Sequence, residues 1–256
     1  MLLTLEDVSI AFGGLMAVRS VSLTVQPGQI LGVIGPNGAG KTTLFNLITG
    51  VYRPSAGQIT FQGHDITRLA PDRRCRLGIA RTFQLVRPFQ GLSVLDNVVV
   101  GRLYGREAAS SRRAAEAEVL AVLTDVGLAE RAHVQARHLT LVDRKRLELA
   151  RALATRPTLL LLDELLAGLN PSEVVAAMGL IRRIRDAGTT IVLVEHLVRA
   201  VFGLSDRVVV LSAGVKIAEG TPAEVANDPQ VVDAYLGAES ELELQMEHAQ
   251  ARGTHA

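Results

Sequence analysis

The sequence has few of the residues that mark several classes of protein. It has a single cysteine, Cys75, which excludes a disulfide framework and a cysteine-based zinc site and fits a reducing compartment. It has no tryptophan, six phenylalanines and three tyrosines, so an aliphatic core is expected. Neither sign of charge dominates, because 27 basic residues face 26 acidic ones. This balance excludes a mainly electrostatic nucleic-acid binder, and we expect no nucleic-acid partner.

Long hydrophobic runs are also missing. The longest apolar runs, at residues 158–162 and 208–211, are the length of strands and far below the roughly 20 residues that cross a bilayer. The first twelve residues lack a basic segment and soon reach Glu6 and Asp7, so they do not read as a signal peptide. We therefore expect a soluble chain of the cytosol, with any membrane role exerted through a partner.

The hydrophobic pattern predicts an α/β fold. Apolar and polar residues alternate at 3–10, 21–25 and 59–61, which indicates a small antiparallel sheet. An unbroken apolar run at 30–34 indicates a strand covered on both faces, and three more apolar runs of strand length lie at 159–162, 190–194 and 207–211. Residues 93–156 read as mostly helical, and residues 174–184 form a further amphipathic helix. Strands that alternate with helices favour a parallel sheet with crossover helices.

A glycine-rich segment follows the buried strand at 30–34 and opens a helix. Its residues fit the pattern G-x-x-x-x-G-K-[ST]: Gly35, Pro36, Asn37, Gly38, Ala39, Gly40, Lys41 and Thr42, with Thr43 next. Glycines let backbone N–H groups converge on phosphate oxygens, and the helix N-terminus adds positive potential. Lys41 would contact the β- and γ-phosphates, and the hydroxyl of Thr42 would join Mg²⁺ coordination. The segment is predicted to be a phosphate-binding loop.

Two carboxylates end another buried strand. Asp163 and Glu164 directly follow the leucines at 159–162. Asp163 would hold Mg²⁺ through water, and Glu164 would polarise a water that attacks the phosphate. Alone, the pair would read as a solvated strand end. Beside a phosphate loop it is predicted to be catalytic.

Further motifs make the sequence resemble the ATP-binding-cassette (ABC) ATPases over residues 3–237. The sequence RTFQ, which ends at Gln84, resembles the Q-loop, and LVEH, which ends at His196, resembles the H-loop. Residues 139–152 resemble the signature helix, and residues 168–170 resemble the D-loop. Phe12 matches the aromatic residue that stacks on adenine in that family, although it would also suit a core position.

This resemblance implies a domain organisation and a set of roles. We expect a P-loop NTPase with a RecA-like parallel-sheet core, a small antiparallel β subdomain and a helical signature subdomain at about 93–156. One domain would span 1–237, with a polar tail at 238–256. Residues 35–43 would wrap the phosphates of ATP, and Thr42, Gln84 and Asp163 would organise Mg²⁺. Glu164 would orient the attacking water, and His196 would contact the γ-phosphate.

Within the family, the sequence is most similar to the ATP-binding subunits of branched-chain (hydrophobic) amino acid importers. The likeness lies in GIARTFQ at 78–84, SVLDNVVVG at 93–101, LLLLDELLAGLNPSE at 159–173 and DPQVVDAYLG at 228–237. The RTFQ form favours the first of the two ATPase subunits of such importers. Implied partners are integral-membrane permease subunits, a second ATPase subunit and, indirectly, a solute-binding protein. The chain would work on the cytoplasmic face of the inner membrane, and Leu85, Arg87 and Phe89 resemble the groove for a permease helix.

The signature departs from the family pattern, which is usually LSGGQ. Residues 139–143 read LTLVD, so Leu141 and Val142 occupy the two glycine positions. In the family this loop caps the γ-phosphate of ATP on the opposite subunit, and branched side chains obstruct the close approach that glycine allows. We therefore predict a working heterodimer, in which the partner supplies an intact signature.

Other interpretations stay open at this point. A non-transport ABC switch would usually carry two cassettes or long coiled-coil insertions. A small-molecule P-loop kinase would not need Gln84, His196 or the signature helix, and Glu164 argues against a regulator without catalysis. The arginine-rich stretch 68–81 is interpreted as a solvated helix face in preference to a patch that contacts a partner or lipid.

Overall fold

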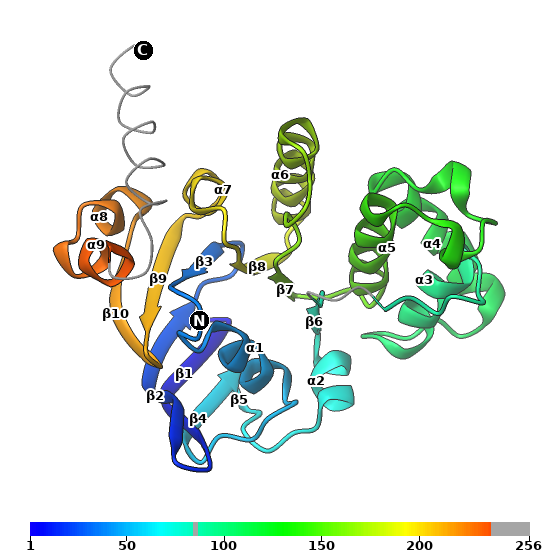
Figure 1. Ribbon diagram of the computed structural model, residues 1–256. Coiled ribbons are helices and arrows are strands. Elements are labelled where there is room, and N and C mark those ends of the chain that lie inside the picture. The colour runs from blue at the N-terminus through cyan, green and yellow to red at the C-terminus, as the bar shows by residue number, and fades with distance from the viewer. Residues whose placement is uncertain (84–86, 237–256) are drawn as a thin grey trace. The chain divides into compact units, whose positions relative to one another are not determined.

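The computed structural model describes residues 1–83 and 87–236 of the chain. The structure divides into two compact units. The first unit combines Met1–Leu69 with the residues from Thr190 onward, and the second consists of Ala70–Thr189. Figure 1 labels the helices and strands of both units.

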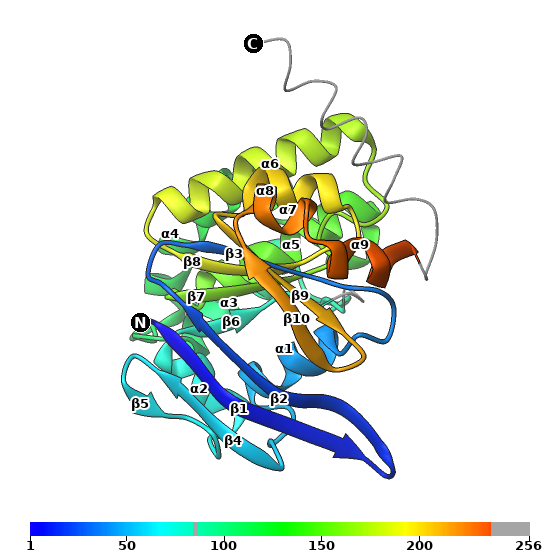
Figure 2. The same cartoon turned by 90° about the vertical axis from the view of Figure 1, so that its left-hand side faces the viewer.

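The first unit contains the predicted antiparallel sheet. Its strands are β1 (Leu3–Phe12), β2 (Leu15–Val25), β4 (Ala56–Phe61) and β5 (His64–Asp65), in the order β2-β1-β4-β5 (Figure 2). The pairing register shifts between Leu5 and Val8, where Asp7 has a φ of 49°. This irregularity explains why the alternation of apolar residues in β1 changes phase.

The first unit also holds three parallel strands: β3 (Ile30–Ile34), β8 (Thr190–Val194) and β9 (Arg207–Ser212). β3 lies between β8 and β9 and is parallel to both, whereas β10 (Val215–Gly220) is antiparallel to β9. Every residue of β3 and β8 is buried, which confirms the prediction for β3 of a strand covered on both faces. Helix α7 (Val198–Leu204) packs so closely on β3 that a Cβ at Gly32 would lie 2.4 Å from Val201.

Three further helices complete the described part of this unit. They are α1 (Lys41–Thr49), α8 (Pro222–Ala226) and α9 (Pro229–Leu236). α8 and α9 lie beside β10, as Figure 1 shows. The polar tail predicted at 238–256 lies outside the described residues.

The second unit pairs the parallel strands β6 (Ile79–Arg81) and β7 (Leu159–Asp163). Its helices are α2 (Pro71–Leu77), α3 (Val94–Tyr104), α4 (Arg112–Asp125), α5 (Leu141–Ala154) and α6 (Pro171–Asp186). α3 packs against both α4 and α5 (Figure 1). The predicted helical character of the middle of the chain and the predicted buried strand at 159–162 are confirmed.

The interpretation of the arginine-rich stretch was wrong in part. Arg73 and Arg76 are exposed, but Arg74 is only 1% exposed and the Arg81 side chain only 5%. Helical periodicity turns Arg74 of α2 inward. Arg81 follows two buried residues on strand β6. Buried guanidinium groups need partners, and the partner of Arg81 belongs to the candidate site described next.

Within residues 1–83 and 87–236, none of the helices combines the length and the apolar character that a bilayer-spanning segment needs.

Candidate functional site

The predicted phosphate loop leaves the carboxyl end of β3 and turns into α1. Gly35 has a φ of 151°, and a Cβ there would lie 2.1 Å from the Leu211 carbonyl oxygen. Gly40 has a φ of 99°, and its Cβ would lie 2.5 Å from the Ala17 carbonyl oxygen. No other residue fits either position without a shift of the neighbouring backbone. Gly35 and Gly40 are therefore required by the packing of the loop against β9 and β2.

Lys41 begins α1 and is only 6% exposed. Its Nζ donates hydrogen bonds to the carbonyl oxygens of Gly35 at 2.6 Å and Pro36 at 3.0 Å. Thr42 is exposed beside it. A buried ammonium held on the loop, together with the N–H groups of a helix N-terminus, makes a site for an anion.

The strand register places His196 beside the phosphate loop. Val33 of β3 is level with Val194 of the neighbouring parallel strand β8. Gly35 and His196 each follow two residues later, at the same edge of the sheet, and adjacent strands lie about 4.8 Å apart. His196 is exposed, whereas the preceding Glu195 is 4% exposed. This arrangement agrees with the prediction that His196 faces the phosphates.

Phe12 lies at the end of β1, next to the hairpin that leads into β2. Its ring is 45% exposed and meets the ring of Tyr52 edge to face, with centroids 5.1 Å apart. Ala17, whose carbonyl crowds Gly40, belongs to the strand after this hairpin. The exposure argues against a core role and leaves the ring available to a flat ligand, although an adenine contact stays a prediction.

The sequence alone did not indicate that Tyr235 contacts the loop from α9. Burial raises the pKa of the Tyr235 phenol, and a hydrogen bond with the backbone of Gly35 opposes this rise. The phenol of Tyr235 therefore lies near the first glycine of the phosphate loop, from a position 200 residues later in the sequence. Nothing in the hydrophobic pattern of α9 distinguishes this tyrosine from a core residue.

In the second unit, Asp163 ends β7 in a buried setting. One of its oxygens, Oδ2, pairs with the Arg81 guanidinium at 2.6 Å, and both side chains are at most 5% exposed. The Asp163 backbone N–H donates to Thr82 Oγ1 at 3.1 Å. The other carboxylate oxygen, Oδ1, is buried and has no hydrogen-bond partner among the residues the structure describes. An unsatisfied carboxylate oxygen fits a magnesium ion or one of its water ligands.

Glu164 follows immediately and is half-buried. Its φ of 50° lies in the left-handed region, which costs a residue with a side chain on the order of 1 kcal/mol or more. Such strain persists only where the surrounding structure enforces it, and it occurs often at active sites. The predicted base is therefore held in an uncommon backbone conformation.

Glu148 of α5 reaches the segment that follows β6. Its Oε1 accepts a hydrogen bond from the Phe83 N–H at 2.7 Å, and the side chain is buried. Burial raises the pKa of Glu148, while this hydrogen bond and the charges of Arg151 and Lys145 oppose the rise. Gln84, the predicted Q-loop residue, comes directly after Phe83 but lies outside the described residues.

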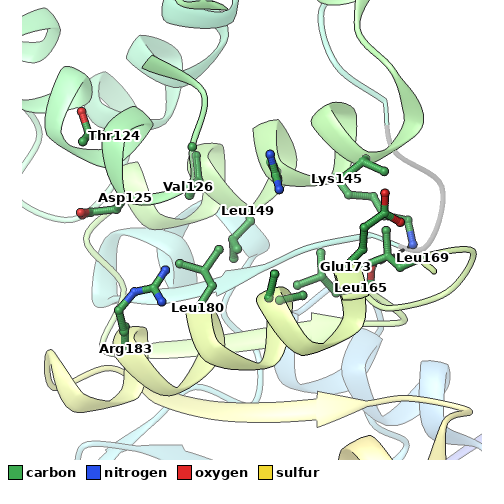
Figure 3. A pocket seen from close by; sticks show the side chains of 15 residues that line it. Thr124, Asp125, Val126, Lys145, Leu149, Leu165, Leu169, Glu173, Leu180 and Arg183 are labelled. Atoms are coloured by element: carbon green, nitrogen blue, oxygen red, sulfur yellow. Dashed lines mark hydrogen bonds between the residues drawn. The ribbon is translucent and has the colours of Figure 1, made fainter. Parts of the chain in front are cut away.

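The altered signature forms an ordered helix start. Thr140 caps α5, because its Oγ1 accepts the Asp143 N–H at 3.2 Å. Asp143 is buried and pairs with Arg131 at 2.6 Å. Leu141 is 55% exposed, while Val142 lines a cavity of about 220 Å³ together with other residues of α5 and residues of α6 (Figure 3). The helix that follows the signature is thus intact even though its glycines are replaced.

The structure gathers the predicted residues into two sets. The first unit contains Phe12, His196 and the loop at 35–43, and the second contains Asp163, Glu164 and the signature helix. Arg81 and Glu148 were missed as site residues. Arg81 stands within the RTFQ sequence, yet the pattern alone does not reveal its partner 82 residues later.

Comparison with known proteins identifies the class. A family model described as ABC transporter matches residues 18–167, and one described as branched-chain amino acid ATP-binding cassette transporter matches residues 215–241. The chain belongs to the ATP-binding cassettes of ABC transporters.

Individual relatives support this assignment. The chain is 42% identical to the high-affinity branched-chain amino acid transport ATP-binding protein LivG of Salmonella typhimurium, over 92% of this chain and 98% of that protein. It is 41% identical to LivG of Escherichia coli, with the same coverage, and 39% identical to BraF of Pseudomonas aeruginosa, also over 92% and 98%.

Solved structures agree with the sequence relatives. A nucleotide-free ATP-binding cassette from an ABC transporter superposes with a TM-score of 0.83 at 29% identity, over 91% of this chain and 98% of that one. A cassette in its ADP conformation gives a TM-score of 0.84 at 29% identity, over 92% and 98%. The predicted fold class and the prediction of a nucleotide-binding ATPase are therefore confirmed.

Proposed function

We propose that this chain hydrolyses ATP to drive import of branched-chain or related hydrophobic amino acids through a membrane ABC transporter. The observation that carries this proposal is the identity of 41–42% with two LivG proteins over nearly their whole length. The match at residues 215–241 supports the same subfamily from a separate part of the chain. A non-transport switch has no such relative among those compared above.

Each set of residues has a proposed role in hydrolysis. The loop at 35–43 wraps the phosphates, with Lys41 as its charge, and the Phe12 ring stacks on adenine. Glu164 orients a water for in-line attack on the γ-phosphate, and His196 contacts that phosphate. Positioning and charge stabilisation supply most of the rate enhancement in phosphoryl transfer. We propose that both sets act on one ATP and that residues 1–237 work as one cassette.

Magnesium fits the donors present. Thr42, Gln84 and Asp163 would hold it, and the unsatisfied Oδ1 of Asp163 supports this assignment. When bound, Mg²⁺ neutralises charge on the phosphates. Arg81 keeps the carboxylate of Asp163 fixed in its buried position.

Permease subunits are the proposed membrane partners, with a solute-binding protein acting indirectly. The chain would then lie at the cytoplasmic face of the membrane. Phe89 is 47% exposed and its ring lies 4.9 Å from the Arg151 guanidinium, while Arg151 also donates to the Arg87 carbonyl at 3.1 Å. An exposed aromatic ring fixed by α5 suits the proposed permease groove, of which Leu85 lies outside the described residues.

The second ATPase subunit is proposed to be a different chain. Leu141 is 55% exposed at the start of α5, so its branched side chain stands where a glycine signature would offer backbone N–H groups. A homodimer would place two such signatures over two ATP molecules. A heterodimer places only one.

Light scattering tests this pairing. The Glu164→Gln variant should trap any dimer that ATP–Mg²⁺ induces, since it removes the charge that supports hydrolysis. We expect this variant to stay monomeric with ATP–Mg²⁺ alone and to dimerise when a second ATPase subunit is added. A stable homodimer would show that leucine and valine are tolerated in the signature.

Uptake of radiolabelled leucine tests the proposed function. The chain would be expressed with candidate permeases, a candidate second ATPase and a candidate solute-binding protein, in cells that lack their own leucine import. We expect uptake with the wild-type chain and none with Lys41→Ala. ATP turnover by the assembled complex without leucine, isoleucine or valine uptake would overturn the amino-acid assignment.

A further inference from the structure

Lysine is rare in this chain and is placed selectively. The sequence has only three lysines, Lys41, Lys145 and Lys216, among 27 basic residues. Lys41 and Lys145 are both buried, at 6% and 8% exposure, although basic residues are seldom found inside proteins. Lys41 already has a place in the phosphate loop. Lys145 of α5 lies outside that loop, and its charge opposes the rise in the pKa of Glu148.

The Lys145 ammonium meets the backbone that carries Glu164. Its Nζ donates to the carbonyl oxygens of Leu165 at 2.9 Å and of Glu164 at 3.4 Å, and it also donates to the carbonyl oxygen of Ala167. Figure 3 shows its side chain extending from α5 toward the loop with Leu165 and Leu169. Three carbonyl groups of one turn therefore converge on one cation.

The geometry of this turn explains why a cation is needed. The chain leaves β7 and turns at once, with Glu164 at a φ of 50°. Carbonyl groups that point the same way in a turn repel one another, and buried ones must find donors. A compact ammonium with three hydrogens can satisfy several of them, whereas the planar guanidinium of arginine is shaped for carboxylates and phosphates. The neighbouring Arg144 and Arg146 are each only partly buried.

We propose that Lys145 is a positioning residue that holds Glu164 in its strained conformation and thereby sets the rate of ATP hydrolysis. It acts through backbone carbonyls and touches neither ATP nor the attacking water. Because Lys145 lies on α5, the signature helix, its hydrogen bonds also link the position of Glu164 to that helix. This inference rests on the proposed role of Glu164.

The test compares Lys145→Met with Lys216→Met, which removes the ammonium that pairs with Glu219 on β10. ATPase activity is measured in the complete transporter. We expect Lys145→Met to lower kcat by about 10- to 100-fold, as small misplacements of catalytic groups do, with KM for ATP within about twofold. Lys216→Met should leave both parameters unchanged. A change mainly in KM, or no change in kcat, would overturn the proposal.

Hydrogen exchange on the full chain gives a readout of the turn itself. In Lys145→Met, the amides of residues 164–169 should exchange at least about tenfold faster, while those of α1 keep their wild-type rates. A uniform rise across the second unit would indicate general destabilisation and would contradict a positioning role. If Lys145→Met does not fold, Lys145→Gln, which keeps two donor hydrogens, is measured in the same way.

A double mutant separates this inference from the proposed base. If Lys145 acts only through Glu164, Lys145→Met should add no further loss of single-turnover rate to Glu164→Gln. An additive loss would overturn the positioning role. If Glu164→Gln alone keeps normal turnover, the base assignment fails, and the exchange measurement still decides whether Lys145 holds the turn.

Discussion

The two halves of the proposed ATP site, one in each unit, are built in opposite ways. In the first unit the phosphate loop is shaped by backbone, because glycines at 35 and 40 pack against the carbonyls of Leu211 and Ala17. In the second unit the carboxylates are held by buried side chains, namely Arg81 on Asp163 and Lys145 on the turn of Glu164. A cradle made of backbone tolerates changes in neighbouring side chains, whereas a network of buried charges fails when one member is lost.

The largest expected effect tests the second half. Arg81→Met leaves the Asp163 carboxylate buried without its cation, which should lower the free energy of unfolding by about 3–5 kcal/mol. Urea denaturation measures this loss. The double variant Arg81→Met with Asp163→Asn should recover much of the stability, since it removes the uncompensated charge. A loss below about 1 kcal/mol for Arg81→Met would show that the pair contributes no more than a surface ion pair.

The next largest effect tests the role of the Lys41 charge in the first half of the site. Lys41→Ala removes the only charged side chain within the phosphate loop, so ATP should bind about 10- to 100-fold more weakly. Isothermal titration calorimetry measures the affinity. Lys216→Ala, the matched change outside the loop, should bind ATP like the wild type, and equal affinity for Lys41→Ala would refute the phosphate-loop assignment.

A smaller effect separates steric crowding in the phosphate loop from the backbone strain of a residue with positive φ. Gly40→Ala puts a Cβ 2.5 Å from the Ala17 carbonyl oxygen at a φ of 99°. Gly63→Ala has a φ of 79° with open space around the Cβ. We expect Gly63→Ala to cost about 1 kcal/mol of stability without changing ATP affinity. Gly40→Ala should cost more and should also weaken ATP binding, and identical behaviour of the two variants would argue against a packed loop.

The smallest expected effect is a change of stability with pH that originates from Glu148 in the second half of the site. Burial raises the pKa of Glu148 in the folded chain, so its protonated form is favoured there. This group contributes stability below its unfolded pKa, and the contribution is lost as pH rises through the higher folded pKa. Glu148→Gln keeps an acceptor for the Phe83 N–H and cannot ionise. It should gain stability relative to the wild type as pH rises from about 4.5 to 7.5, and a constant difference across this range would contradict the prediction.

The sequence predicted the first half better than the second. Strand β3, its glycines and Lys41 are contiguous, so a local pattern contains the whole phosphate loop. Arg81 and Asp163 are 82 residues apart, and no local pattern indicates that they pair. Helical periodicity likewise could not tell which of the three consecutive basic residues 144–146 is buried. The left-handed conformation of Glu164 follows from its surroundings and leaves no trace in residue type.

Local residue preferences also explain which helix boundaries can be predicted from the sequence. Thr140 and Asn170 are N-caps of α5 and α6, and Pro171 occupies the first turn of α6, as residue preferences predict. The exposure of Phe12 was not predictable, because an aromatic residue at a strand end suits both a core and a ligand platform. The burial of Arg74 and Arg81 was also not predicted, because the charge of a residue does not show whether its side chain is buried.

The most direct test of the account is a paired measurement on Glu164→Gln in the assembled transporter. This variant should bind ATP–Mg²⁺ with nearly wild-type affinity but hydrolyse it at least about a hundredfold more slowly, within the range of general-base effects. Binding is read by calorimetry and hydrolysis by single-turnover phosphate release on the same preparation. Turnover within a few fold of the wild type, with intact binding, would contradict the assignment of Glu164 as the base.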